Sequence, residues 1–338
     1  MAIENANPVT YADWAKTRDP DGKTAAIVEL LAQTNPIIQD AHVREGNLTT
    51  GHRTTIRTGY GQSTWRRLNY GVQPSKTTSK QIDDHAGMLE DYNEIDKALA
   101  DLENDKAAFM LSESSGTMEE MSQTHANTLF YGDTSVNPER FLGFTYRYDD
   151  KDAPNGRNIV NGQAAGGTPA GNTSSSIWFI TWGADTAFEF FPKGSMVGLQ
   201  MRDLGEHTLY DANGGRYQGY RVHFKHDVGL SVRDWRYHVR ICNLEAASIQ
   251  ADSIDLVKLL IKAYHKIQNM GRGQTVIYAN RAVLASLDIK AQFNSNVNLT
   301  RMEWHGQQIT AFRGIPIRMC EALDASDETP VGTGTWQS

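Results

Sequence analysis

The side chains best suited to bind a metal ion are His223, His226 and Asp227, which lie close together in the chain. The surrounding pattern, in which Val222 and Phe224 alternate with polar residues, is typical of a β-strand. Residues three apart on a strand point to opposite faces, so His223 and His226 cannot share one ion. No third or fourth ligand stands at a suitable spacing. We therefore expect no metal site.

A second group of reactive side chains is a dense run of carboxylates: Glu94, Asp96, Asp101, Glu103 and Asp105. Paired carboxylates can work as acid and base, but only where they converge in a pocket. We expect these side chains to spread over one exposed helix face. This favours a solvated surface, or one that faces a partner, over a catalytic site.

Motifs for phosphate binding or nucleophilic catalysis are incomplete. Gly271-Arg272-Gly273 falls between an expected helix and an expected strand, whereas a phosphate cradle needs a strand followed by a helix. The chain has no Gly-x-Ser-x-Gly turn. Cys242 and Cys320 have no metal-type spacing, and buried free thiols are favoured over a disulfide between them. The sequence predicts no catalytic residue, no cofactor and no enzyme.

The composition is that of an ordinary globular protein. The chain has 338 residues, 39% hydrophobic residues and a net charge of −7, which argues against a general attraction to nucleic acid. It has no apolar run of about 18 residues, so we expect no membrane span. Its first residues, MAIENANPVTYADW, lack a basic start and an apolar core, so we do not expect a signal peptide.

Residues 42–80 are basic and poor in aliphatic side chains, with seven Lys and Arg against one acid, a net +6. Residues 54–58 are predicted to form one strand and 65–70 its return, with glycines near the turn. A hairpin without an apolar face is marginally stable alone. We therefore expect it to project and to find a partner outside its own domain. Its interleaved Arg, Trp and Tyr also fit a nucleic-acid surface, which remains an alternative.

Residues 83–131 carry apolar side chains at helical spacing and contain no proline, which predicts one long spine helix. Within it, residues 83–120 hold twelve acids against Lys97 and Lys106, a net −10. Because a basic hairpin precedes an acidic helix, we hypothesise that the hairpin of one subunit lies on the helix of another. The expected contacts join Arg53, Arg57, Arg66, Arg67, Trp65 and Tyr60 with Glu94, Asp96, Asp101, Glu103 and Asp105.

The remaining segments divide by pattern. Residues 1–41 are expected to be an arm with one helix, Thr24–Gln33. A short aromatic strand near 141–148 and a polar loop, 151–176, follow the long helix. Further on, 176–245 reads as strands with a turn at 211–215, and 250–319 alternates helices and strands.

Four short motifs, in this order along the chain, resemble tailed-bacteriophage major capsid proteins with the Hong Kong 97-like fold. They are Trp65–Val72 (WRRLNYGV), Asn127–Asp133 (NTLFYGD), Tyr278–Asn280 (YAN) before a helix, and Gly314–Ile317 (GIPI). The resemblance covers most of residues 20–325.

The resemblance implies an α+β fold with a peripheral (P) domain, an axial (A) domain and an extended E-loop. The expected division is 1–41 arm, 42–82 E-loop, 83–132 spine helix of the P domain, 133–175 connection, 176–245 P-domain strands, 246–325 A domain and 326–338 loose tail. The family usually places its long P-domain strands near the C-terminus. Here the strands come earlier, which we interpret as a rearranged order; the alternative is that they belong to the A domain. The tip, Tyr60–Arg67, has no Lys, so we do not expect covalent crosslinking.

The function implied by the resemblance is self-assembly into hexamers and pentamers of an icosahedral shell around double-stranded DNA. The protein would assemble in the host cytoplasm and reside in the virion capsid. Its partners would be further copies of itself, portal, scaffold and decoration proteins, and DNA that is enclosed without specific readout. Two alternatives remain: an encapsulin-like compartment with protein cargo, and a ligand-binding protein or enzyme that uses the β region 176–245.

Overall fold

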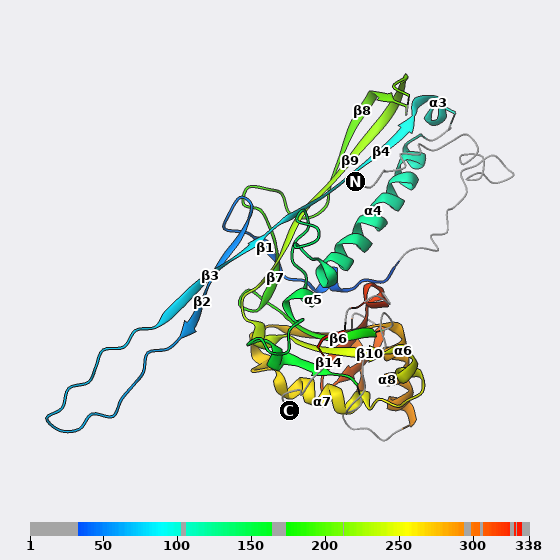
Figure 1. Cartoon of the computed structure of the whole chain (residues 1–338). Helices are drawn as coiled ribbons and strands as arrows, with labels where there is room; N and C mark the ends of the chain where they lie inside the picture. The colour runs from blue at the N-terminus through cyan, green and yellow to red at the C-terminus, as the bar shows by residue number, and fades with distance from the viewer. Residues whose placement is uncertain are drawn as a thin grey trace.

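The computed structural model describes residues 33–102, 106–163, 174–211, 213–293, 299–304, 307–324, 328 and 330–332. These residues form an α+β molecule with a compact body, an elongated extension and a hairpin that projects from their junction (Figure 1). The expected helix Thr24–Gln33 lies outside the described residues apart from Gln33, and Glu103 and Asp105 also lie outside them.

The body is built on β6 (Ser174–Trp182), β10 (Val239–Glu245), β11 (Gln274–Ala279) and β14 (Ile315–Met319). Strand β6 lies between β10 and β11 and is antiparallel to both, while β11 is parallel to β14. Every residue of β6 is buried, so both of its faces are covered.

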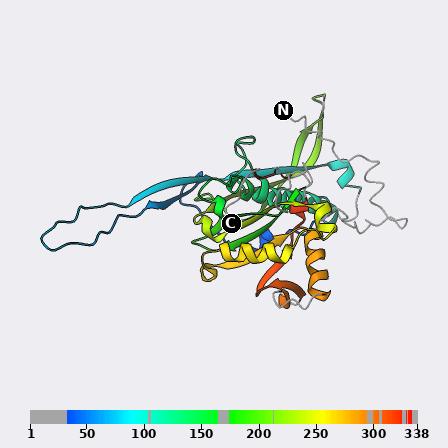
Figure 2. The same ribbon diagram turned by 60° about the horizontal axis from the view of Figure 1, so that its bottom comes forward.

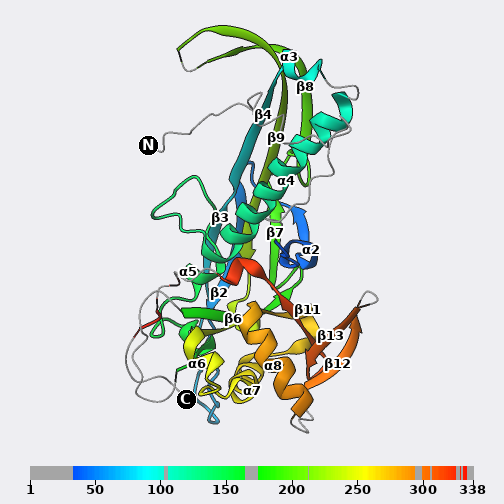
Figure 3. The ribbon, with the colours of Figure 1, turned by 90° about the vertical axis from the view of Figure 1, so that its right-hand side faces the viewer.

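The two faces of β6 belong to two hydrophobic clusters. Ile177 and Phe179 pack with α6 (Ala246–Gln250), α7 (Leu256–Lys266) and α8 (Arg281–Phe293), which lie together on one side of the sheet (Figure 3). Trp178 and Ile180 pack on the other side, with the end of α4 (Lys106–Tyr131) and with α5 (Phe144–Arg147). Because successive side chains of a strand point to opposite faces, β6 contributes to the hydrophobic layers on both sides of the sheet.

Side-chain caps fix where the helices of the body begin. The Asp255 carboxylate accepts a hydrogen bond from the Lys258 amide at the start of α7 (3.1 Å). The Asn280 side chain accepts one from the Val283 amide in the first turn of α8 (2.9 Å). The predicted alternation of helices and strands over 250–319 is confirmed.

Shorter elements complete the described part. At one edge of the body, β12 (Leu299–Trp304) and β13 (Gln307–Phe312) continue the sheet beyond β14. Strand β5 (Ile159–Asn161) pairs with β10, and β1 (Val43–Glu45) pairs with β7 (Ala187–Phe191). The remaining short helices are α2 (Ile37–Asp40), α3 (Lys97–Ala100) and the 3-10 turns Gly156–Asn158, Trp235–Tyr237, Met270–Arg272 and Glu321–Asp324.

The extension is organised by β9 (Arg216–Val232). This strand pairs with β4 (Gly87–Asp96) on one side and with β8 (Gln200–Tyr210) on the other, and its last residues pair with β7. Helix α4 lies along this sheet, where Met121 packs against Val222 and Phe224 (Figure 3).

The strands expected within 176–245 are confirmed as β6, β7, β8, β9 and β10, with the predicted turn between β8 and β9. In that turn the Gly215 amide donates to the Asp211 carboxylate (2.6 Å). However, β6 and β10 pair within the body, whereas β8 and β9 form the extension. The expected β region is therefore divided between the two parts of the molecule.

The expected single helix over 83–131 is wrong in its first half. Residues 87–96 form β4, which pairs with β9 from Gly87↔Val228 to Asp96↔Gly219. The only long helix in the described part of this region is α4, which begins at Lys106. The apolar spacing of Tyr92 and Ile95 fits a helix, but the open edge of β9 satisfies the β4 backbone, and this tertiary pairing overrides the local pattern.

The projecting hairpin consists of β2 (Gly51–Gly59) and β3 (Thr78–His85), paired from Gly51↔His85 to Gly59↔Thr78. The predicted first strand, 54–58, is confirmed. The predicted return strand, 65–70, is wrong because the return strand is β3, and 60–77 form a long tip (Figure 1). At the root, the Asp84 carboxylate accepts hydrogen bonds from Arg147 (2.9 Å) and from the Ser231 hydroxyl (2.8 Å).

Two expectations for residues 133–176 are also wrong. The predicted aromatic strand is the short helix α5, because Phe144 and Tyr148 turn inward against Trp178. The predicted polar loop, 151–176, is wrong at β5, which adds to the sheet beside β10, and at its last residues, which begin β6. Residues 164–173 of this loop lie outside the described residues.

The C-terminal segment 326–338 was expected to be a loose tail, which is wrong for Glu328 and Val331. The buried Glu328 carboxylate lies 3.1 Å from the Arg240 guanidinium and accepts a hydrogen bond from the Ser176 hydroxyl (2.6 Å). The backbone of Val331 exchanges two hydrogen bonds with the Asn243 side chain, each 3.0 Å long. These contacts hold the segment against β6 and β10.

The buried pair gives a direct prediction. Glu328→Gln leaves the Arg240 guanidinium buried without its counter-charge, which typically costs about 3–5 kcal/mol. We expect a clear fall in the urea midpoint of unfolding. The control is Asp152→Asn, an exposed carboxylate that pairs with Lys151, and this change should cost at most ~1 kcal/mol. Equal midpoints for the two variants would show that Glu328 does not hold the tail.

Candidate assembly interface

The tip of the hairpin, residues 60–77, exposes an unusual set of large side chains. Trp65 is 103% exposed, Leu68 87% and Tyr60 80%. The tip extends away from both the body and the extension (Figure 1, Figure 2). Within the described residues, the tip forms no strand with any other segment. Exposed aromatic and aliphatic side chains that gather in this way are typical of surfaces that bind another protein.

The hairpin cations fall into two groups. Arg53 is held within the hairpin by a bidentate pair with Asp83 on the opposite strand (2.6 and 2.7 Å). Arg57 lies over the ring of Tyr60 at 5.9 Å. In the described part of the chain, Arg57, Arg66 and Arg67 form no ion pair, so these three remain available to a partner.

Of the acids predicted to meet these cations, the three described ones lie at the far end of the extension. Glu94 on β4 pairs with Arg221 on β9 (2.5 Å). Asp96 caps α3 by accepting from the Ala98 amide (2.8 Å). Asp101 is exposed just after α3. The structure does not bring these acids to the hairpin within one subunit, so a contact between subunits stays a prediction.

The two histidines considered as metal ligands lie on opposite faces of β9, as predicted. The His223 ring stacks on Tyr92 (4.4 Å between centroids), and its Nε2 lies 3.3 Å from Glu90. His226 faces α4, where its ring meets that of His125 at 4.9 Å. No group of three potential metal ligands converges within the described residues.

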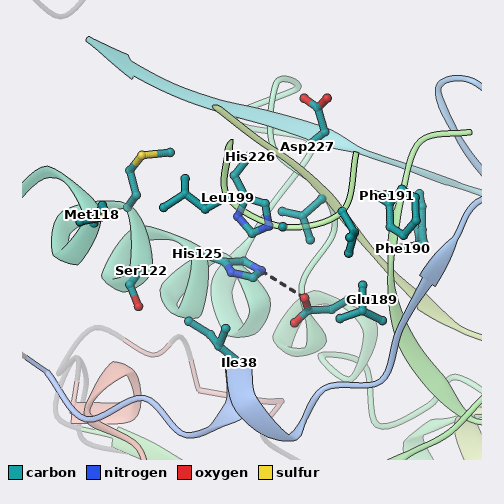
Figure 4. A pocket seen from close by; sticks show the side chains of 15 residues that line it. Ile38, Met118, Ser122, His125, Glu189, Phe190, Phe191, Leu199, His226 and Asp227 are labelled. Atoms are coloured by element: carbon teal, nitrogen blue, oxygen red, sulfur yellow. Dashed lines mark ion pairs between the residues drawn. The ribbon is translucent and has the colours of Figure 1, made fainter. Parts of the chain in front are cut away.

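Sequence patterns gave no sign of a cavity beside α4. It has a volume of about 300 Å³ and lies between α4, β7, β9 and the segment before β8 (Figure 4). Its walls are mainly apolar, and its lining residues are Ile38, Val43, Met118, Met121, Ser122, His125, Glu189, Phe190, Phe191, Val197, Gly198, Leu199, His226, Asp227 and Val228. These residues come from segments far apart in sequence, so only the fold brings them together.

Two titratable side chains meet in this cavity with unusual protonation. The Nε2 atom of His125 lies 3.6 Å from the Glu189 carboxylate, and both side chains are buried (Figure 4). Burial, aided by the nearby His226, lowers the pKa of His125 to about 3. Burial also raises the pKa of Glu189 to about 8. Near neutral pH both groups are therefore mainly uncharged.

These shifts predict how stability depends on pH. His125 has a folded-state pKa of about 3 against an ordinary value of 6.5, so the unfolded chain binds more protons and stability falls as the pH drops below 6.5. Glu189 has a folded-state pKa of about 8 against an ordinary value of 4.5, so stability falls as the pH rises from 4.5 through 8.

In Glu189→Gln, the stability of the folded state should therefore fall much less as the pH rises. Its fall at acid pH, which depends on His125, should remain. The measurement is the urea midpoint as a function of pH, and the matched control is the exposed Glu139→Gln. If the urea midpoint of Glu189→Gln fell with rising pH as steeply as that of the wild type, the raised pKa of Glu189 would be contradicted.

Comparisons with known proteins match this architecture to viral shells. The family described as Major capsid protein GP7 matches residues 19–331. A chain in a structure of bacteriophage Epsilon15 is 36% identical, with 100% of both chains covered and a TM-score of 0.74. A bacteriophage JBD30 capsid chain shares the fold at 10% identity, with 93% of this chain and 99% of that chain covered and a TM-score of 0.51.

Other comparisons are weaker or negative. An encapsulin from Synechococcus elongatus is 10% identical, with 66% of this chain and 92% of that chain covered, and its TM-score of 0.44 is too low to support an argument. No curated protein matches the chain. None of the helices in the described part is long and apolar enough to cross a membrane.

The family match favours the phage shell over the encapsulin-like compartment, and a family of structural capsid proteins implies a non-enzymatic role. The fold is of the Hong Kong 97-like type found in phage capsids. The chain therefore belongs to the GP7 family of major capsid proteins and forms part of a bacteriophage capsid.

Proposed function

We propose that this capsid protein builds its shell from hexamers and pentamers in which the hairpin of each subunit lies on a neighbouring copy. The observation that carries the proposal is the exposed tip, where Trp65, Leu68 and Tyr60 have little contact with their own subunit. Leaving such side chains in water is costly, and burying them against a neighbour yields roughly 1.5–3 kcal/mol for each large apolar side chain.

Charge supports the choice of partner surface. Residues 42–80 carry a net +6 and residues 83–120 a net −10. The described part of the acidic stretch forms the end of β3, then β4, α3 and the first part of α4. Arg57, Arg66 and Arg67, with Tyr60 and Trp65, form the contact on one side. On the other side is the acidic stretch of the neighbour, with Asp101 after α3 and Glu113, Glu119 and Glu120 on α4. Glu103 and Asp105, also named in the predicted contact, lie outside the described residues. Each exposed ion pair contributes only ~0–1 kcal/mol, so their role is orientation and register.

Contacts within the subunit support a narrower contact than the predicted one. Arg53 and Glu94 already pair inside the subunit, with Asp83 and Arg221 respectively, and Asp96 caps α3. These three residues therefore shape the two surfaces rather than bind across the interface.

Strand pairing supports a revised division into domains. The P domain comprises β4, β8, β9 and α4. The A domain comprises the body, so β6 and β10 belong to it because they pair with each other and β6 also pairs with β11. This assigns the expected 176–245 region to both domains and keeps 42–82 as the E-loop.

Further partners follow from the role of a shell. The enclosed DNA is held without sequence readout, because a subunit with a net charge of −7 does not grip a polyanion strongly. Portal, scaffold and decoration proteins complete the particle. The protein has no catalytic role and needs no cofactor.

The direct test is negative-stain electron microscopy of the purified full-length protein, alongside light scattering. Closed shells, or rings of five and six subunits, are expected. Subunits that stay monomeric even when co-expressed with a scaffold protein would contradict the proposal.

Reversing the hairpin charge should block assembly without unfolding the subunit. In the triple variant Arg57→Glu, Arg66→Glu and Arg67→Glu, the tip would be repelled by the acidic surface of the neighbour. We expect few or no shells by electron microscopy and a circular dichroism spectrum like that of the wild type.

The matched control replaces the same three residues by Lys, which keeps the charge and should preserve assembly. Normal shells from the Glu variant would show that hairpin charge does not set the contact.

A further inference from the structure

The cavity beside α4 is open to solvent, and apolar side chains surround its mouth. Val197, Val43 and Leu199 are all exposed there. Met118 and Phe191 extend the apolar walls inward. An exposed apolar hollow of this kind favours an apolar side chain of a partner.

The floor of the cavity is polar and incompletely satisfied. His125 Nε2 and Glu189 Oε1 are buried, and within the described residues neither forms a hydrogen bond. The 3.6 Å between His125 and Glu189 is too long for a good one (Figure 4). A buried acceptor without a donor costs about 1–3 kcal/mol, so a partner that brings one donor into this apolar hollow would be favoured.

The tip of the hairpin carries a side chain with these properties. Trp65 is fully exposed, and its indole is a large apolar ring with one N–H that donates and cannot accept. Arg66 and Arg67 follow it directly, and residues 60–77 contain no acid. Helix α4, which forms one wall of the cavity, carries Glu113, Glu119 and Glu120 against Lys106, a net −2.

The tip cannot reach the cavity of its own subunit, because the hairpin extends away from the body and from α4 (Figure 1, Figure 2). A hairpin tip that fills the cavity must then belong to a second copy of the chain.

We infer that Trp65 of one subunit inserts into the cavity beside α4 of a neighbouring copy, with its indole N–H directed at the His125 and Glu189 pair. The inference rests on the proposed contact between hairpin and neighbour, and it names the site where that contact is anchored. Arg66 and Arg67 then lie next to the acidic surface of α4. Each subunit both donates a Trp and receives one, as a ring of identical subunits requires.

The test is a disulfide between the tip and the mouth of the cavity in assembled shells. Thr64→Cys with Val197→Cys keeps Trp65 and places one thiol beside the tip and one at the mouth. The native Cys242 and Cys320 are both buried, so they should add little background. After mild oxidation and denaturation, we expect most of the monomer band to be lost to a ladder of linked chains.

The matched control pairs Thr64→Cys with Ile289→Cys, an exposed residue on α8 away from the cavity, and should remain monomeric. Shells that form normally but give no ladder in the Val197 variant would overturn the inference and leave the proposed function standing. Absence of shells from the wild-type protein would instead count against the proposed function.

A competing occupant is the chain's own N-terminal segment, since the described chain begins at Gln33, whose amide donates to Glu119 on α4 (2.9 Å). Leu30→Cys with Val197→Cys tests this segment. An efficient link within one chain, together with no ladder for Thr64 and Val197, would show that the arm fills the cavity and that Trp65 does not.

A second experiment uses the cavity itself. Trp65→Ala and the cavity-filling Leu199→Trp should lower the yield of shells to a similar extent, since one removes the side chain and the other its site. Tyr70→Ala, also on the tip, should reduce the yield less. Equal yields for all three variants and the wild type would overturn the inference.

Discussion

The pairing of β9 with three other strands is the interaction on which the remaining structure depends. Its first residues lie between β4 and β8, and its last residues pair with β7, which joins the body through β6. At the change of partner stands Gly229, where an added Cβ would lie 2.5 Å from the Phe190 ring and 3.0 Å from the His85 carbonyl oxygen. Only a glycine lets the strands approach so closely there.

The position of the hairpin is a consequence of this strand. Since β4 pairs with β9 and follows β3 after a single residue, the direction of the hairpin is set by the sheet of the extension. Asp84 fixes the root by its bonds to Arg147 and Ser231. The result is a firmly held root and a tip, 60–77, that has no strand partner among the described residues. The proposed contact with a neighbouring subunit would give this tip its partner.

Local signals predicted the parts of the fold that depend on neighbours in sequence. The helices and strands of 250–319, the strands of 176–245 and the turn at 211–215 were read from periodicity and turn residues. The strand at 87–96 was missed because its partner lies more than a hundred residues away, and a helix-like spacing hid it. The buried tail was missed because Glu328 looks like a solvated acid until Arg240 is placed beside it.

The general position of the candidate interface was predictable from sequence, but its individual contacts were not. Composition alone predicted a basic hairpin that projects, yet it could not show that Arg53 is already paired with Asp83 or that Glu94 is held by Arg221. The cavity was beyond sequence reasoning, because His125, Glu189 and His226 lie on three separate elements. Isolated histidines on such elements are usually packed or solvated residues, and nothing in their spacing marks a shared site.

The most direct test of the central claim, that the hairpin tip is completed by a neighbouring subunit, is amide hydrogen exchange measured in dissociated subunits and in assembled shells. The account predicts fast exchange over residues 60–77 in free subunits and strong protection in shells. The paired strands β2 and β3 should be protected in both states and serve as the internal reference. Equally fast exchange of 60–77 in shells would show that the tip stays free, and would contradict the account.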